Sequence, residues 1–391
     1  VTAIGATGDI LFASGSTIIN TRGGLTGGKG GTVSLTADRT INYTGAASAI
    51  NASPTAGSGN GGTVTIIASN AVNGGTVNLT APVTASGSGT GDGGKISLTN
   101  NSSGATQIHS PLTASSGTNG VGGTITLTAL GNVTNGGLAI AAAANLTATG
   151  NGAVTGTGGT ITINAGGATP GILTLSSAAV NADAIGTVGK GGTIDASGSG
   201  IGTAGGVQLL SARGAQSAGG VGAGGKITVQ ATVTDLNVFS TFSLQATSCK
   251  AGGGGGTITA SAGRTLQIAG SLDASTVGGA GNGGTIKLTG STVTKTGFLT
   301  SLATITANAG TSGIGGTVDI TNNSSSLIQV GPINANGGTG TAGDGGTITV
   351  TNKGNGVAAN GGITLNGNIS ASSTGALGTG NGGTITVDAF S

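Results

Sequence analysis

The sequence predicts an all-β protein, a parallel β-helix (β-solenoid) of about twelve coils with about 32 residues and three short strands in each coil. Three observations support this prediction. A motif of the form GG[TK][IV] recurs at a regular spacing in twelve copies (a thirteenth match, at 74–77, lies within a repeat), apolar residues alternate with Thr, Ser and Asn around it, and no segment shows helical periodicity. Alternation with a period of two is typical of half-buried strands.

The spacing of the repeat favours coils over other repeat architectures. In the twelve regularly spaced copies of the motif, the second glycine falls at 31, 62, 94, 123, 159, 192, 225, 256, 284, 316, 346 and 383, a mean spacing of 32 residues. Such periods are found in solenoids, propellers and arrays. A propeller needs tight hairpin turns and bulkier residues. One similar strand per repeat instead favours parallel stacking, with each coil about 4.8 Å above the last.

Each coil is predicted to contain three strands in a fixed order. The first follows the glycine pair, as in "TITLTA" at 124–129, where Ile and Leu face inward and Thr faces outward. The second is a short alternating run, as in "TVNLT" at 76–80, "LQI" at 266–268 and "GITLN" at 362–366. The third places an apolar residue two before a small one, as in "VTASG" at 83–87. A loop rich in Gly, Ser, Thr and Asn then leads to the next glycine pair.

Small residues mark the predicted corners of the coil. The alanine after the third strand fits a narrow corner, and the set comprises Ala85, Ala114, Ala148, Ala274, Ala335 and Ala371. The glycine pair is interpreted as a corner that needs positive φ and no Cβ, and not as a phosphate-binding loop. Asp92 and Asp344 precede the pair, with Asn60, Asn282 and Asn381 in the equivalent place. We expect them to accept a backbone N–H at a turn; a metal site is the alternative.

The composition excludes several classes of protein. Of 391 residues, 87 are Gly and 6% are charged, with a net charge of +2 and no basic cluster, so no nucleic-acid partner is expected. The longest apolar run, 138–144, is too short for a membrane-spanning helix. The single cysteine excludes an intrachain disulfide. So few charges protect poorly against association, which indicates a molecule held in an assembly or on a surface.

The chain is expected to be one continuous solenoid domain, 1–391, either a mature subunit or a segment of a longer repetitive chain. No cofactor or metal site and no catalytic residue is predicted. Asp195 and Asp319 share one outward position four coils apart, about 19 Å, whereas paired glycosidase carboxylates lie about 5–9.5 Å apart. With no Glu in the chain, we expect no enzyme. Lys287 and Asp319 are predicted to pair across adjacent coils.

Three further features carry predictions. His109 is expected to face solvent, and Cys249 is expected to be buried in the apolar position of the third strand, where Val83 and Leu112 stand in other coils. The phenylalanines Phe239, Phe242 and Phe298 form a candidate lateral-contact patch where a neighbouring rod packs. The alternative is that these large side chains fill a wider part of the core.

The sequence pattern "GGTITLTA" followed by "NLTATG" resembles the β-strand repeats of giant bacterial surface proteins, including filamentous-haemagglutinin-like adhesins. The resemblance covers the whole chain. It implies a secreted right-handed parallel β-helix that works at the cell surface as a stalk, fibre or adhesive surface. The partners it implies are further copies or a continuing chain, and host-surface or matrix polysaccharide.

The leading functional hypothesis is therefore a structural extracellular rod that assembles by strand stacking and lateral contacts. The alternative is an ice-binding solenoid that uses outward Thr-x-Thr ladders, such as Thr63/Thr65 and Thr124/Thr126. Charged residues interrupt these ladders, namely Lys95, Asp195, Lys226, Lys287 and Asp319. A polysaccharide-binding or polysaccharide-degrading β-helix is a minor alternative, without an aromatic platform because the chain has one Tyr and no Trp.

Overall fold

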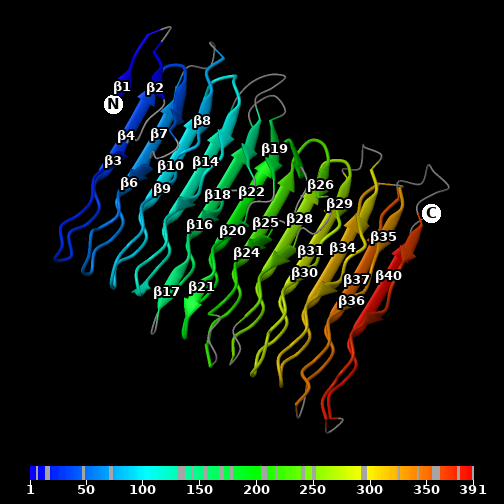
Figure 1. Ribbon diagram of the computed structural model, residues 1–391. Helices are drawn as coiled ribbons and strands as arrows, with labels where there is room; N and C mark the ends of the chain where they lie inside the picture. The colour runs from blue at the N-terminus through cyan, green and yellow to red at the C-terminus, as the bar shows by residue number, and fades with distance from the viewer. Residues whose placement is uncertain are drawn as a thin grey trace.

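The computed structural model describes residues 1–5, 8–13, 18–45, 49–69, 74–130, 137–141, 144–152, 156–166, 171–176, 179–203, 209–215, 219–238, 243–248, 252–291, 297–324, 326–340, 343–354, 362–376 and 379–389. In this part of the chain all elements are β-strands, and they stack in sequence order from the N-terminus at one end to the C-terminus at the other (Figure 1). Three long parallel sheets, here called A, B and C, contain 13, 12 and 12 strands.

Sheet A contains the six-residue strands that follow the glycine pairs, preceded by one two-residue strand. Its strands are β1 (Thr2–Ala3), β4 (Thr32–Ala37), β7 (Thr63–Ala68), β10 (Lys95–Asn100), β14 (Thr124–Ala129), β18 (Thr160–Ala165), β22 (Thr193–Gly198), β25 (Lys226–Ala231), β28 (Thr257–Ala262), β31 (Thr285–Gly290), β34 (Thr317–Asn322), β37 (Thr347–Asn352) and β40 (Thr384–Ala389).

Sheets B and C contain the second and third strands of each coil. Sheet B consists of β2 (Ile10–Ala13), β5 (Ile41–Thr44), β8 (Val77–Leu79), β11 (Thr106–Ile108), β15 (Leu138–Ile140), β19 (Ile172–Leu175), β23 (Gly200–Thr203), β26 (Leu236–Val238), β29 (Leu266–Ile268), β32 (Leu299–Ser301), β35 (Ile328–Val330) and β38 (Ile363–Leu365). Sheet C consists of β3 (Ile18–Asn20), β6 (Ala49–Asn51), β9 (Val83–Thr84), β12 (Leu112–Thr113), β16 (Leu146–Thr147), β20 (Ala179–Asn181), β24 (Leu209–Ser211), β27 (Ser243–Gln245), β30 (Leu272–Asp273), β33 (Ile305–Thr306), β36 (Ile333–Asn334) and β39 (Ile369–Ser370).

A smaller three-stranded sheet forms in the loops between sheets C and A. It contains β13 (Asn119–Gly120), β17 (Gly150–Gly152) and β21 (Ala184–Gly186), with β13 and β17 antiparallel. Isolated parallel bridges continue this stacking from Val188 to Val221, Gly252 and Ala280. The loops therefore stack as well as the strands in the middle of the molecule.

The alternation of apolar and polar residues determines which way each strand faces. In β14, Ile125 and Leu127 are fully buried, and both lie in register with the inward residues of β18. One inward column of sheet A contains Val33, Val64, Ile96, Ile125, Ile161, Ile194, Ile227, Ile258, Ile286, Val318 and Ile348, all buried. Burying one such side chain contributes about 1.5–3 kcal/mol, so stacking of coils is the main source of stability.

The corner alanines are buried as expected, from Ala85 (0% exposed) to Ala371 (6%). At the end of the sheet A strands, three coils place Asn where others have Ala: Asn100, Asn322 and Asn352, each fully buried. The amide of Asn100 donates to the Gly104 carbonyl at 3.1 Å, and that of Asn322 donates to the Ser326 carbonyl at 3.0 Å. Each buried amide thus satisfies the backbone of a longer turn.

The structure confirms the predicted parallel β-solenoid with three strands per coil. The alignment of Cys249 with the apolar column of the third strand is wrong. Leu244 of β27 pairs with Leu210 and Leu272 in that column and is fully buried. Cys249 lies outside the described residues. The error arose because the loop lengths vary. Aligning the third strand five residues too late, at Cys249 and not at Leu244, still matched the pattern of an apolar residue close to a small one.

Candidate functional site

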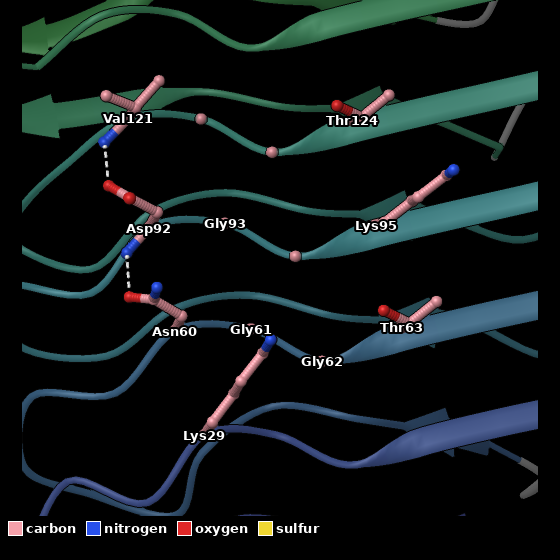
Figure 2. A pocket seen from close by; sticks show the side chains of 13 residues that line it. Lys29, Asn60, Gly61, Gly62, Thr63, Asp92, Gly93, Lys95, Val121 and Thr124 are labelled. Atoms are coloured by element: carbon pink, nitrogen blue, oxygen red, sulfur yellow. Dashed lines mark hydrogen bonds between the residues drawn. The ribbon is translucent and has the colours of Figure 1, made fainter.

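A shallow open groove lies at the corner where the chain enters sheet A. It has a volume of about 380 Å³. Three successive glycine pairs form its floor, and two rows of side chains form its edges (Figure 2). The lining residues are Lys29, Asn60, Gly61, Gly62, Thr63, Asp92, Gly93, Gly94, Lys95, Val121, Gly122, Gly123 and Thr124.

The glycines of the floor are required because backbones approach closely. A Cβ on Gly61 would overlap the carbonyl oxygen of Ala85, and one on Gly62 would overlap that of Gly31. The described glycines with positive φ do not include these pairs, so the predicted need for positive φ is wrong here. The backbone N–H of Gly62 donates to the Ala52 carbonyl at 2.8 Å, which closes the coil.

One edge of the groove is a hydrogen-bonded ladder along the axis of the solenoid. The backbone N–H of Asp92 donates to Asn60 Oδ1 at 3.0 Å, and the N–H of Val121 donates to Asp92 Oδ1 at 2.8 Å (Figure 2). The same contact joins Ile314 to Asn282 at 2.9 Å. The predicted role of these side chains as acceptors of backbone N–H groups is confirmed, with the donor one coil further along.

The opposite edge is the first outward column of sheet A. Lys95 lies in register between Thr63 and Thr124. Lys29 reaches toward the floor at Gly61 from one coil below, while Lys95 projects from the far edge (Figure 2). Both lysines and Asp92 are exposed. Two ammonium groups and one carboxylate therefore border the groove.

Asp195 and Asp319, the two carboxylates considered as a glycosidase pair, lie where the sequence predicts. Asp195 and Asp319 occupy one outward column, with Thr228, Thr259 and Lys287 between them. They are thus four coils apart. Lys287 Nζ lies 4.0 Å from Asp319 Oδ2, which confirms the predicted ion pair.

The other predicted residues divide into described and undescribed ones. His109 is exposed, with its Nε2 3.5 Å from Oε1 of Gln107, as expected of a solvent-facing histidine. Of the candidate lateral-contact patch, Phe298, just before β32, is 44% exposed; Leu302, just after β32, is 53% exposed. Phe239 and Phe242 lie outside the described residues, so the patch remains a prediction.

Three cross-coil aspartate–arginine pairs were missed in the sequence. Asp9 pairs with Arg39 and Asp235 pairs with Arg264, both just before strands of sheet B, whereas Asp183 pairs with Arg213 just after strands of sheet C. In each pair the aspartate also accepts a backbone N–H one coil on. A signal was present, because Asp and Arg recur about one repeat apart beside the same strand.

The guanidinium groups determine the acidity of two of these aspartates. Hydrogen bonds from Arg39 hold the pKa of Asp9 below its ordinary value. Those from Arg264 do the same for the pKa of Asp235. The backbone N–H of Thr265 adds a further bond of 3.0 Å to Asp235 Oδ1. Both carboxylates are therefore stabilised in the charged form.

The described strands define a three-sided parallel β-solenoid. Comparison with protein-family models, with curated proteins and with solved structures finds no match. In the described part of the chain, no helix is long and apolar enough to cross a membrane, and no group of three or more His, Cys, Asp and Glu residues is placed to hold a metal ion.

Proposed function

We propose that this protein is a structural rod of an extracellular fibre, filament or cell-surface adhesin. The observation that carries the proposal is the continuity of the core. Among the described residues, one cluster of buried apolar side chains runs from Ile10 to Ala371. A molecule stacked in this way is stiff along its axis, because bending it must separate main-chain hydrogen bonds and packed columns together.

The surface composition supports the same proposal. The outward face of sheet A is mostly Thr, Ser and Asn, with six charged residues: Lys95, Asp195, Lys226, Lys287, Asp319 and Asp388. A weakly charged surface opposes association only weakly. Phe298 and Leu302, at the two ends of β32, are exposed apolar side chains at which neighbouring rods would make lateral contact.

Two forms of the rod fit the proposal. In β40, Ile385 and Val387 are 46% and 42% exposed, whereas their register partners Ile348 and Val350 are fully buried. A further coil, from the same polypeptide or from a second copy, would cover them. Intact-mass measurement of the native material distinguishes these forms, since a mass near 35.7 kDa indicates subunits and a far larger mass indicates one long chain.

The proposal is tested on native material and on the source cells. Negative-stain images should show straight, narrow rods, and an antibody against the chain should label intact cells. Removal of that label by an added protease that leaves the cells whole would support surface exposure. Globular particles, or labelling only after lysis, would contradict the proposal.

An ice-binding solenoid is the second candidate. The Thr-x-Thr pairs do stack in register, as Thr124/Thr126 on Thr160/Thr162 show. The interrupting charges lie in two columns, Lys95 and Lys226 in the first and Asp195, Lys287 and Asp319 in the second. Uncharged stretches across both columns are therefore short, which disfavours a flat ice-binding face. Thermal hysteresis in dilute solution would support this candidate.

We propose no catalytic activity. A separation of four coils between Asp195 and Asp319 corresponds to about 19 Å, too far for a pair of glycosidase carboxylates. Hydrolysis of any polysaccharide by the purified protein, lost on replacement of either aspartate, would contradict this part of the proposal.

A further inference from the structure

We propose that the groove bordered by Lys29 and Lys95 binds a linear anionic polysaccharide that lies along the axis of the solenoid. This names a class of partner for the proposed extracellular rod, and it rests on the proposed function only in placing the ligand outside the cell. The groove is open at the surface and has a volume of about 380 Å³.

The charged groups stand on opposite edges of this groove. Lys29 precedes one glycine pair, and Lys95 follows another two coils further along, so their positions are offset by about 10 Å along the axis. Figure 2 shows Lys29 extending over the floor toward Gly61. An acidic chain lying between the edges would have an ammonium group on each side.

The carboxylate of Asp92 reduces the positive charge of the groove only in part. One of its oxygens accepts the backbone N–H of Val121 at 2.8 Å, which holds the side chain in the ladder. None of the ion pairs among the described residues includes Lys29 or Lys95. Both ammonium groups therefore stay available to an anion.

Lys190 and Lys226 also flank glycine pairs further along the solenoid, but they are one coil apart, about 5 Å along the axis, whereas Lys29 and Lys95 are two coils apart. Lys190 precedes a glycine pair as Lys29 does, and Lys226 follows the next pair as Lys95 does, in register with Thr193 and Thr257. Both are exposed. Four of the eight lysines of the chain thus flank glycine pairs directly. A long acidic polymer would meet both lysine pairs on one rod.

The chemistry of the groove favours an acidic polysaccharide over a nucleic acid. Single-stranded nucleic acids bind through aromatic stacking as well as charge, and the chain's only Tyr, Tyr43, is fully buried. The groove also has no aromatic side chain on which a neutral sugar could stack. The hydroxyls of Thr63 and Thr124 line the groove beside the lysines. Hydroxyl donors and ammonium groups match the hydroxyls and acidic groups of such a chain.

The test compares two double variants that lose the same charge. In Lys29→Gln/Lys95→Gln the groove loses both ammonium groups. In Lys287→Gln/Lys353→Gln, two exposed lysines elsewhere are lost. Binding of fluorescent heparin, polygalacturonate, neutral dextran and oligo-dT is measured by titration at low and high salt, with circular dichroism confirming the fold of each variant.

We expect heparin or polygalacturonate to bind and dextran not to bind, with affinity falling as salt rises. The groove variant should bind about tenfold more weakly, and the control variant should stay within about twofold of the wild type. Equal weakening in both variants, absence of binding to either acidic polysaccharide at low salt, or tighter binding of oligo-dT would overturn the inference. Failure of surface labelling or rod formation would sink the proposed function and leave this binding result intact.

Discussion

The carboxylate of Asp92 accepts a hydrogen bond of 2.8 Å from the backbone N–H of Val121, one coil further along the solenoid. At the corners between strands, side chains of this kind add to the main-chain hydrogen bonds that join successive coils. Asn308 does the same for the N–H of Asn336 at 2.8 Å. The corners are thus held by side-chain acceptors in addition to main-chain ones, such as the Asp92 carbonyl, which accepts the N–H of Gly61 at 2.9 Å.

Replacement of Asp92 by Ala should destabilise the protein by about 0.5–1.5 kcal/mol, because the N–H of Val121 loses its acceptor. The Asp92→Asn variant retains a side-chain oxygen and should stay close to the wild type. Chemical denaturation followed by circular dichroism measures both. Equal losses would show that the charge matters and not the acceptor.

Replacement of Gly61 by Ala should be strongly destabilising, by roughly 3 kcal/mol or more, because the new Cβ overlaps the Ala85 carbonyl. Gly24→Ala is the matched control, since no atom lies within 4 Å of a Cβ built there. Its φ is not in the left-handed region, so Ala should be neutral or slightly stabilising. Thermal melting distinguishes them. Similar melting temperatures would contradict the close approach of backbones at the glycine pair.

The exposed pair Lys287–Asp319 and the buried pair Arg213–Asp183 should contribute differently to stability when the cation is removed. Lys287→Ala removes a partner of Asp319 at 4.0 Å in an exposed pair and should change stability by about 0–1 kcal/mol. Arg213→Ala leaves Asp183, whose side chain is 2% exposed, without its cation and should cost about 3 kcal/mol. Denaturation midpoints test this order. A large effect at Lys287 would show that the coils are wrongly registered.

Acid should weaken the protein through Asp9 and Asp235. The pKa of each is lower in the folded state than the ordinary 3.8, so their stabilisation is complete above that value and is lost as pH falls through the folded pKa. The Asp9→Asn/Asp235→Asn variant should be less stable than the wild type near neutral pH, with the difference shrinking below about pH 4. Asp195→Asn serves as the control for charge loss on sheet A. A constant difference at all pH values would refute this explanation.

The sequence was sufficient to predict the parts of the fold that repeat in phase. The glycine pair gives the start of each sheet A strand, and the alternation after it gives the inward residues, such as Ile125 and Leu127. Prediction failed where loops change length, as at Cys249, because the phase of the third strand is then lost. It also failed at the glycine pair, where close contact between coils, and not φ, requires Gly.

The candidate site was predictable only in part. The acceptor role of Asn60 and Asp92 followed from their place before the glycine pair. The groove did not follow, because its two edges come from different coils and its lysines lie apart in the sequence. The aspartate–arginine pairs could have been found as Asp and Arg about one repeat apart. Whether two such residues meet depends on the register between adjacent coils, which the sequence alone does not give where loops vary in length.

The central claim is that residues one coil apart lie directly above each other, and cysteine cross-linking tests it most directly. With Cys249 replaced by Ser, Thr126→Cys/Thr162→Cys joins two register partners, whereas Thr126→Cys/Asn164→Cys is offset by two residues. A disulfide needs Cα atoms about 4.4–6.8 Å apart, which only the first pair satisfies. We expect intact mass spectrometry after mild oxidation to show an intramolecular disulfide in the first variant alone. A disulfide in the offset variant, or in neither, would contradict the register on which the solenoid is built.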